Sequence, residues 1–93
     1  MNITETILKS TKIKLETEIK LCNSYKSTSA GIRDDVVLFT ERSEVIKCEV
    51  LGLLGQAHNY GLLTYEEVED ASYRLGVLLS DKYVEFLKVI RGL

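Results

Sequence analysis

Proline is absent from this 93-residue chain, and cysteine and histidine are scarce, with two cysteines and one histidine. Proline costs about 3 kcal/mol in a helix interior, so its complete absence favours long, uninterrupted helices. No stretch approaches the length of about 18 apolar residues that a membrane-spanning helix needs. The N-terminus lacks the basic segment and apolar core of a signal peptide. We therefore expect a cytoplasmic protein with reduced thiols, not associated with a membrane.

An excess of positive charge is also missing. The chain carries 12 Lys and Arg against 14 Asp and Glu, for a net charge of −2. A nucleic-acid binder needs a basic surface, so no nucleic-acid partner is expected. Cys22 and Cys48 lie far apart and match no metal or redox spacing, and His58 has no second ligand nearby. We expect no metal ion and no cofactor.

The residues that are present predict one folded domain over residues 1–93. A hydrophobic content of 45% with 28% charged residues is ordinary for a globular protein. The expected fold is all-α: a three-helix bundle with a long N-terminal helix, a central helix and an antiparallel C-terminal helical hairpin. The predicted helices span residues 2–22, 34–60 and 64–91, with a loop at 23–33.

The central helix is the most informative segment, because apolar residues recur along it at alternating spacings of four and three, as in a packed helix seam. This row comprises Phe39, Ser43, Ile46, Val50, Leu53, Ala57 and Tyr60. Val37, Cys48 and Leu51 fall elsewhere on the helical wheel, so the helix is apolar on more than one face. We expect neighbouring helices or another copy of the chain to cover it, which predicts a homo-oligomer.

The N-terminal segment is open to two interpretations. Between Lys12 and Leu21 apolar and charged residues alternate strictly, which is a strand pattern. The same segment carries oppositely charged pairs four residues apart, such as Lys12 with Glu16, and these support a helix. We favour the helix, with Ile13 as an apolar residue that lies off its main apolar face.

Capping signals define the C-terminal hairpin. Gly61 suits the left-handed turn that closes a helix, and Thr64 with Glu67 has the spacing of a capping box. The connection between them is short, which predicts antiparallel neighbours. Gly52, Gly55 and Gly76 lie inside predicted helices, where glycine costs close to 1 kcal/mol, so we expect another backbone to cross closely at these positions, either within the bundle or between subunits.

A polar row beside the apolar seam of the central helix suggests a protein interface. Arg42, Glu49 and Gln56 follow one another at intervals of seven residues, as do the residues that set partner and register in coiled coils. With the apolar residues on either side, the predicted partner interface comprises Leu38, Arg42, Val45, Glu49, Leu51 and Gln56. The expected function is a small, self-associating protein–protein interaction protein, namely an adaptor, inhibitor or chaperone-like regulator, and not an enzyme.

Two alternatives remain at the level of sequence. The loop residues Lys26, Ser27, Thr28 and Arg33 could bind a small phosphorylated ligand, because they precede a helix N-terminus. Acidic pairs at Glu41 with Glu44 and at Glu67 with Asp70 could instead belong to a divergent all-helical, metal-dependent nucleotide hydrolase. We expect these carboxylates to lie on solvated faces, with no catalytic residue among them.

Overall fold

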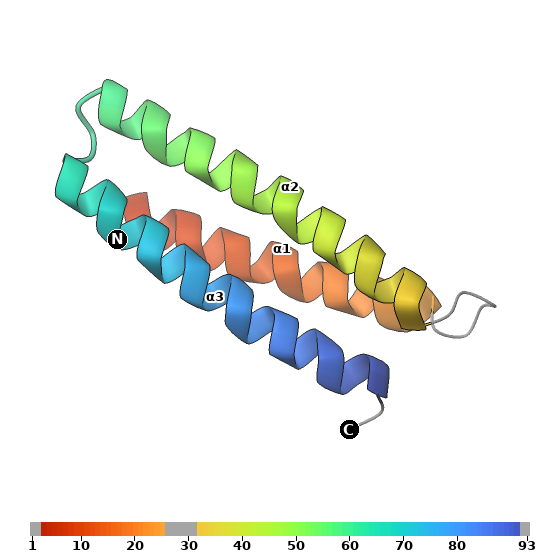
Figure 1. The fold of residues 1–93 in the computed structure, drawn as a ribbon. Helices are drawn as coiled ribbons and strands as arrows, with labels where there is room; N and C mark the ends of the chain where they lie inside the picture. Colours follow the sequence, from red (N-terminus) through yellow and green to blue (C-terminus); the bar gives the residue numbers. More distant parts are fainter. Residues whose placement is uncertain (1–2, 26–31, 92–93) are drawn as a thin grey trace.

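Over the residues that the structure describes, three helices form the protein, and their arrangement can be followed in Figure 1. The computed structural model describes residues 3–25 and 32–91, and their side chains over 3–21 and 35–90. Helix α1 spans Ile3–Tyr25, α2 spans Ile32–Asn59 and α3 spans Tyr65–Arg91. Each helix packs against the other two, and the bundle extends over 48 × 20 × 17 Å. The predicted all-α three-helix bundle is therefore confirmed.

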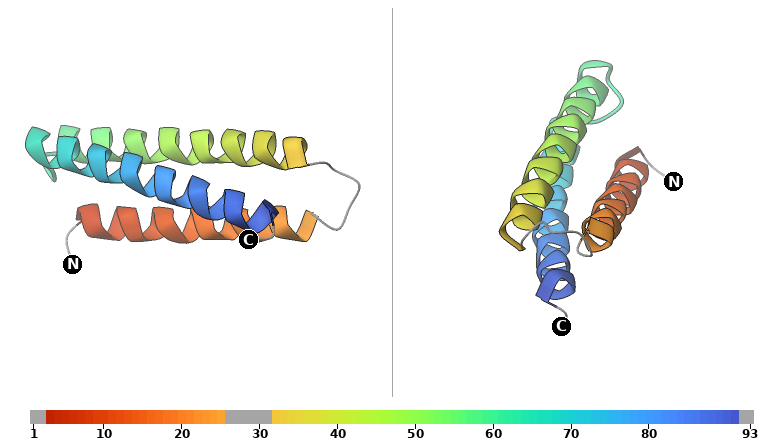
Figure 2. Two further views of the ribbon diagram at one scale, coloured as in Figure 1. Left: turned by 60° about the horizontal axis from the view of Figure 1, so that its bottom comes forward. Right: turned by 90° about the vertical axis from the view of Figure 1, so that its right-hand side faces the viewer.

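Helices α2 and α3 form the antiparallel hairpin, and α1 lies along both of them. The N-terminal end of α1 is at the same end of the bundle as the α2–α3 turn, so α1 runs antiparallel to α2 (Figure 2). Segments 12–21 and 35–57, far apart in the sequence, thus lie in one bundle.

Helix ends differ from the predicted bounds around the loop assigned to residues 23–33. Helix α1 continues to Tyr25, and α2 begins at Ile32, so the ends of that predicted loop are helical. Hydrophobic periodicity lapses where a helix passes beyond the core, whereas its backbone hydrogen bonds can continue for another turn. The sequence pattern therefore ends α1 too early and begins α2 too late.

Residues 12–21 are helical, which settles the choice between strand and helix. The helical period buries Leu15 and Ile19 and turns Ile13 and Leu21 outward, with Ile13 57% exposed. Thr17 donates a hydrogen bond from Oγ1 to the carbonyl oxygen of Ile13 at 2.9 Å, as hydroxyls on helices often do. Ile13 is thus an apolar side chain on the surface, as its place on the helical wheel indicated.

The core consists of two apolar clusters along the bundle. One lies toward the α2–α3 turn and contains Leu8, Leu15, Ile46, Val50, Leu54, Ala57, Leu63, Ala71 and Leu75. The other contains Ile19, Phe39, Phe86 and Ile90, with the two phenyl rings stacked at 4.2 Å between centroids and 7° between planes. All three helices contribute to both clusters.

One part of the predicted central seam is wrong. Leu53 is 48% exposed and Tyr60 80%, whereas Leu54 is 1% exposed and takes the core position. A helix makes 3.6 residues per turn, so a row selected at strict seven-residue intervals drifts off the buried face. The buried row instead continues by four residues from Val50 to Leu54.

The α2–α3 turn forms as its capping residues predict. Gly61 has a φ of +76°, and the amide of Leu62 donates to the carbonyl of Ala57 at 2.8 Å, which closes α2 in a Schellman motif. The Thr64 amide then donates to Glu67 Oε1 at 3.0 Å, and the Glu67 amide donates to Thr64 Oγ1 at 3.1 Å. These reciprocal bonds form the predicted capping box of α3.

The helical glycines do not mark crossings within the bundle. A Cβ atom built at Gly52, Gly55 or Gly76 would meet no heavy atom within 4 Å. The prediction of close backbone crossings inside the chain is therefore wrong, because the helices pack through their buried rows and these glycines lie outside them.

Candidate interaction surface

A shallow groove between α1 and α2 brings together three of the six residues predicted as a partner interface. Arg42, Val45 and Glu49 line it from α2, together with Ile46; the residues that line it from α1 are Ile13, Lys14, Thr17 and Glu18. Its volume of about 300 Å³ is at the lower limit for pockets that enclose small molecules, roughly 300–1,000 Å³. A groove of this size suits one or two protruding side chains of another protein.

Two apolar side chains are exposed in this groove. Ile13 is 57% exposed and Val45 55%, although they lie on different helices that pack together. Charged residues of both signs surround them: Lys14 and Arg42 are cationic, and Glu18 and Glu49 are anionic. The groove therefore combines exposed apolar surface with balanced charge, as the core and rim of a protein interface do.

The other three predicted interface residues lie apart from this groove. Leu38 is half-buried and packs against the cluster of Phe39 and Phe86, so its main role is in the core. Leu51 and Gln56 are both exposed on α2, but neither lines the groove. The predicted interface thus divides between the groove, the core and other parts of the α2 surface.

The sequence pattern of α2 alone missed the contribution of α1. On its own helix, Ile13 is only an apolar residue that lies off the main apolar face. Its position opposite Val45 depends on how the two helices align, which no single-helix wheel contains. The sequence feature that could indicate this groove is the combination of Ile13, an apolar residue off the main face of its helix, with the polar row that contains Arg42 and Glu49.

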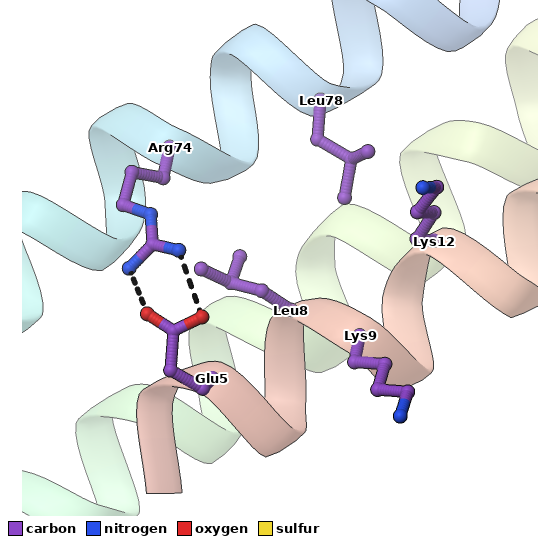
Figure 3. A pocket seen from close by; sticks show the side chains of 6 residues that line it. All are labelled: Glu5, Leu8, Lys9, Lys12, Arg74 and Leu78. Atoms are coloured by element: carbon purple, nitrogen blue, oxygen red, sulfur yellow. Dashed lines mark hydrogen bonds and ion pairs between the residues drawn. The ribbon is translucent and has the colours of Figure 1, made fainter. Parts of the chain in front are cut away.

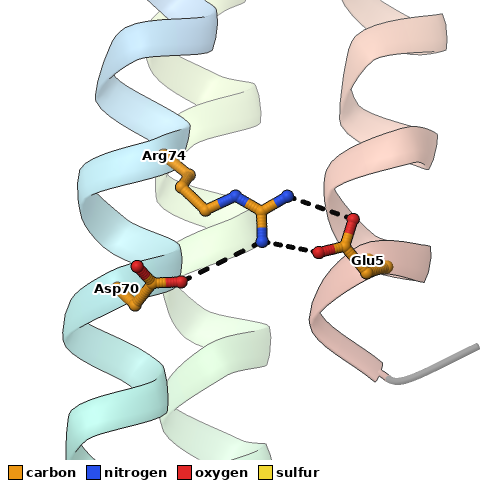
Figure 4. A network of polar contacts seen from close by, with 3 residues as sticks. All are labelled: Glu5, Asp70 and Arg74. Carbon is orange, nitrogen blue, oxygen red and sulfur yellow. Dashed lines mark hydrogen bonds and ion pairs between the residues drawn. The ribbon is translucent and has the colours of Figure 1, made fainter.

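Ion pairs join α1 to α3. Arg74 donates through both terminal nitrogens to the Glu5 carboxylate, at 2.6 and 3.0 Å, and Asp70 lies 3.9 Å from the same guanidinium (Figure 4). Farther along, Lys82 contacts Glu85 at 2.8 Å and Glu16 at 3.6 Å, and its side chain is only 11% exposed. The hydrogen bond to Glu85 is the main reason that the pKa of Lys82 is raised despite burial.

A second hollow lies beside the Glu5–Arg74 pair, between α1 and α3 (Figure 3). Leu8 and Leu78 form its apolar part, with Lys9 and Lys12 at its edge on α1. The apolar side chains of this hollow are buried or half-buried, since Leu8 lies in the core and Leu78 packs against it, whereas Ile13 and Val45 are each more than half exposed. We therefore take the α1–α2 groove as the candidate site.

The Glu5–Arg74 pair predicts a specific acid dependence of stability. The Arg74 hydrogen bond holds the pKa of Glu5 below its ordinary value of 4.5 in the folded protein. A lowered folded-state pKa stabilises the fold above the unfolded-state value, and this stabilisation is lost as pH falls through the folded-state value. We expect Glu5→Gln to lower the free energy of unfolding near neutral pH, and this deficit to disappear at pH values below 4.5.

Chemical denaturation at a series of pH values measures that deficit. Arg74→Gln is the matched variant, because it removes the same pair from the α3 side. The double variant should lose no more stability than a single variant does, because both single substitutions remove the same ion pair. A Glu5→Gln deficit that persists unchanged in strong acid would contradict this assignment of the pair.

The predicted phosphate-binding residues are not placed by the structure. Lys26, Ser27 and Thr28 lie outside the described residues, and Arg33 lies in the first turn of α2 without a described side chain.

The acidic pairs lie on exposed surfaces. Glu41, Glu44, Glu67 and Asp70 are all exposed, with Glu67 used in the α3 cap and Asp70 beside Arg74. Among the residues that the structure describes, no three His, Cys, Asp or Glu side chains gather as a metal ion would require. His58 places Nδ1 3.0 Å from the carbonyl oxygen of Leu63 and lies edge-on to Tyr65, which ties it to the α2–α3 turn.

Within residues 3–25 and 32–91, no helix combines the length and apolar character needed to cross a bilayer. Comparisons with protein-family models, curated proteins and solved structures find no match to this chain. The function must accordingly be argued from the residues themselves.

Proposed function

We propose that this protein is a small helical protein–protein interaction module that self-associates and binds a second protein at the α1–α2 groove. An adaptor, inhibitor or chaperone-like regulator would work in this way, by occupying a surface of its partner. The observation that carries the proposal is the pair Ile13 and Val45, each more than half exposed and both lining one groove. Apolar side chains gathered in a groove with a polar rim are typical of interaction sites.

The shape and charge of the groove favour a partner helix. An amphipathic helix can place one apolar side chain against Ile13 and Val45 while its flanking residues meet the charged rim. Because the rim has two cations and two anions, a partner with both signs of charge fits better than a uniformly acidic or basic one. The groove therefore selects its partner by the order of charges along the partner helix.

Site-specific photo-crosslinking tests the proposal in cells that express the tagged protein. A photoreactive phenylalanine at Thr17, which is exposed and lines the groove, should give a discrete crosslinked product. Ile13→Asp in the same chain should remove that product, because a buried carboxylate in the contact is unfavourable. The mass of the product distinguishes a second copy from a different protein.

The same photoreactive residue at Glu66 provides the matched control, since Glu66 is exposed on α3 and does not line the groove. Circular dichroism of the Ile13→Asp variant checks that the helices remain. Equal crosslinking from the two positions, or a product from Thr17 that survives Ile13→Asp, would rule out the groove as the binding site.

A further inference from the structure

Helix α3 carries a narrow apolar row on the side that faces away from the core. Tyr73 is 74% exposed, Val77 45% and Val84 51%, and with the exposed Ser80 they follow the four-three-four spacing of a coiled-coil seam. We call Tyr73, Val77, Ser80 and Val84 the outer seam. It lies apart from the α1–α2 groove, on a face of α3 that neither α1 nor α2 covers.

Charges along one flank of this seam are arranged with opposite signs about its centre. Asp70 and Lys88 lie at its two ends, nearly the same number of residues from the midpoint between Val77 and Ser80. Asp81 and Arg74 lie closer to that midpoint, one on each side. When the helix is reversed end to end about that midpoint, Asp70 falls one residue from Lys88 and Asp81 falls two residues from Arg74, within reach of these long side chains.

We infer that the outer seam binds the α3 helix of a second copy of this chain, antiparallel to the first and related to it by a two-fold axis near residues 78–79. In that arrangement Tyr73 of one copy packs against Val84 of the other, and the two copies of Val77 and Ser80 meet at the centre. Asp70 of each copy pairs with Lys88 of its partner. This inference rests on the self-associating part of the proposed function and is independent of the groove.

Charge favours the antiparallel orientation over the parallel one. In a parallel pair this flank would face the opposite flank of the partner, which carries Glu69, Gly76 and Tyr83, so its charges would meet no complementary set. Both groups reach solvent: the Asp70 side chain is 67% exposed, with only a long contact of 3.9 Å to Arg74, and Lys88 is also exposed. A single helix pair buries a modest area, so the dimer should dissociate on dilution.

Light scattering behind a sizing column, over a wide range of protein concentration, tests the inference on the full chain. The wild type should shift from monomer to dimer as concentration rises, and Val77→Asp should remain monomeric. Asp70→Lys and Lys88→Asp should each weaken the dimer by about tenfold, because every copy then opposes like charges at two places. The double variant Asp70→Lys with Lys88→Asp should recover the wild-type association, since the reversed pairs are again complementary.

Circular dichroism and thermal unfolding check that each variant keeps its helices, and recovery in the double variant excludes misfolding as the cause of weaker association. A wild type that stays monomeric at all concentrations would overturn both this inference and self-association. A dimer that is lost with Val45→Asp but unaffected by Val77→Asp would overturn the outer seam alone and move self-association to the groove. Failure of the double variant to recover would overturn the antiparallel pairing.

Discussion

Phe86→Ala is expected to lower the free energy of unfolding by about 3–5 kcal/mol, the usual range for a large aromatic side chain lost from a core. Phe86 is fully buried and stacks on Phe39 at 4.2 Å between ring centroids. Among the side chains that the structure describes, its cluster has four buried members, with Ile19 and Ile90 as the others. Small domains have total stabilities toward the lower end of roughly 5–15 kcal/mol, so much of the variant should be unfolded at 25 °C.

Urea denaturation followed by circular dichroism measures this loss. Tyr60→Ala provides a matched control, because it also removes an aromatic ring but from a side chain that is 80% exposed. That control should change stability by no more than about 0.5 kcal/mol. A Phe86→Ala variant as stable as Tyr60→Ala would mean that the Phe39–Phe86 stack is not part of the folded core.

Leu54→Ala should be nearly as destabilising, at about 2–5 kcal/mol, whereas Leu53→Ala should cost under about 1 kcal/mol. The two residues are chemically identical neighbours on α2, and only Leu54 lies in the core cluster. This pair therefore tests the register of α2 against α1 and α3. The measurement is the midpoint and slope of chemical denaturation for both variants under identical conditions.

The reverse order would show that α2 is rotated by about one residue, or 100°, from the packing described. The apolar row that the sequence predicts, which contains Leu53, would then be the buried one. Equal losses would indicate that the α2 surface around Leu53 is covered by another molecule, which the concentration dependence of the Leu53→Ala effect would reveal.

Local signals predicted the fold because each depends on residues close in sequence. Thr64 and Glu67 cap α3 through bonds within one helical turn, and Gly61 adopts the left-handed backbone that its position required. The helix at 12–21 prevailed over the strand because the helical period buries Leu15 and Ile19 together. Such features need no knowledge of how the helices align.

The candidate site could be predicted only in part, because it depends on that alignment. The polar row with Arg42 and Glu49 was identified along α2, and both line the groove. The place of Ile13 in the groove is set by packing between segments far apart in sequence, so no pattern within one helix predicts it. Leu38 packs against the cluster that contains Phe39 and Phe86, a contact between helices that the pattern of α2 alone does not reveal.

Because the space around the helical glycines is open, substitutions at these positions can increase the stability of the fold. Gly52, Gly55 and Gly76 could each accept a methyl group without meeting a neighbouring atom in the chain. Alanine at such a site restricts the unfolded chain and adds about 0.4–1 kcal/mol, which thermal unfolding of a Gly55→Ala variant would reveal. Three such changes would offset roughly half of one severe core substitution. With such changes the chain could tolerate destabilising substitutions on its surface, including ones that alter which proteins it binds, and still fold into its helices.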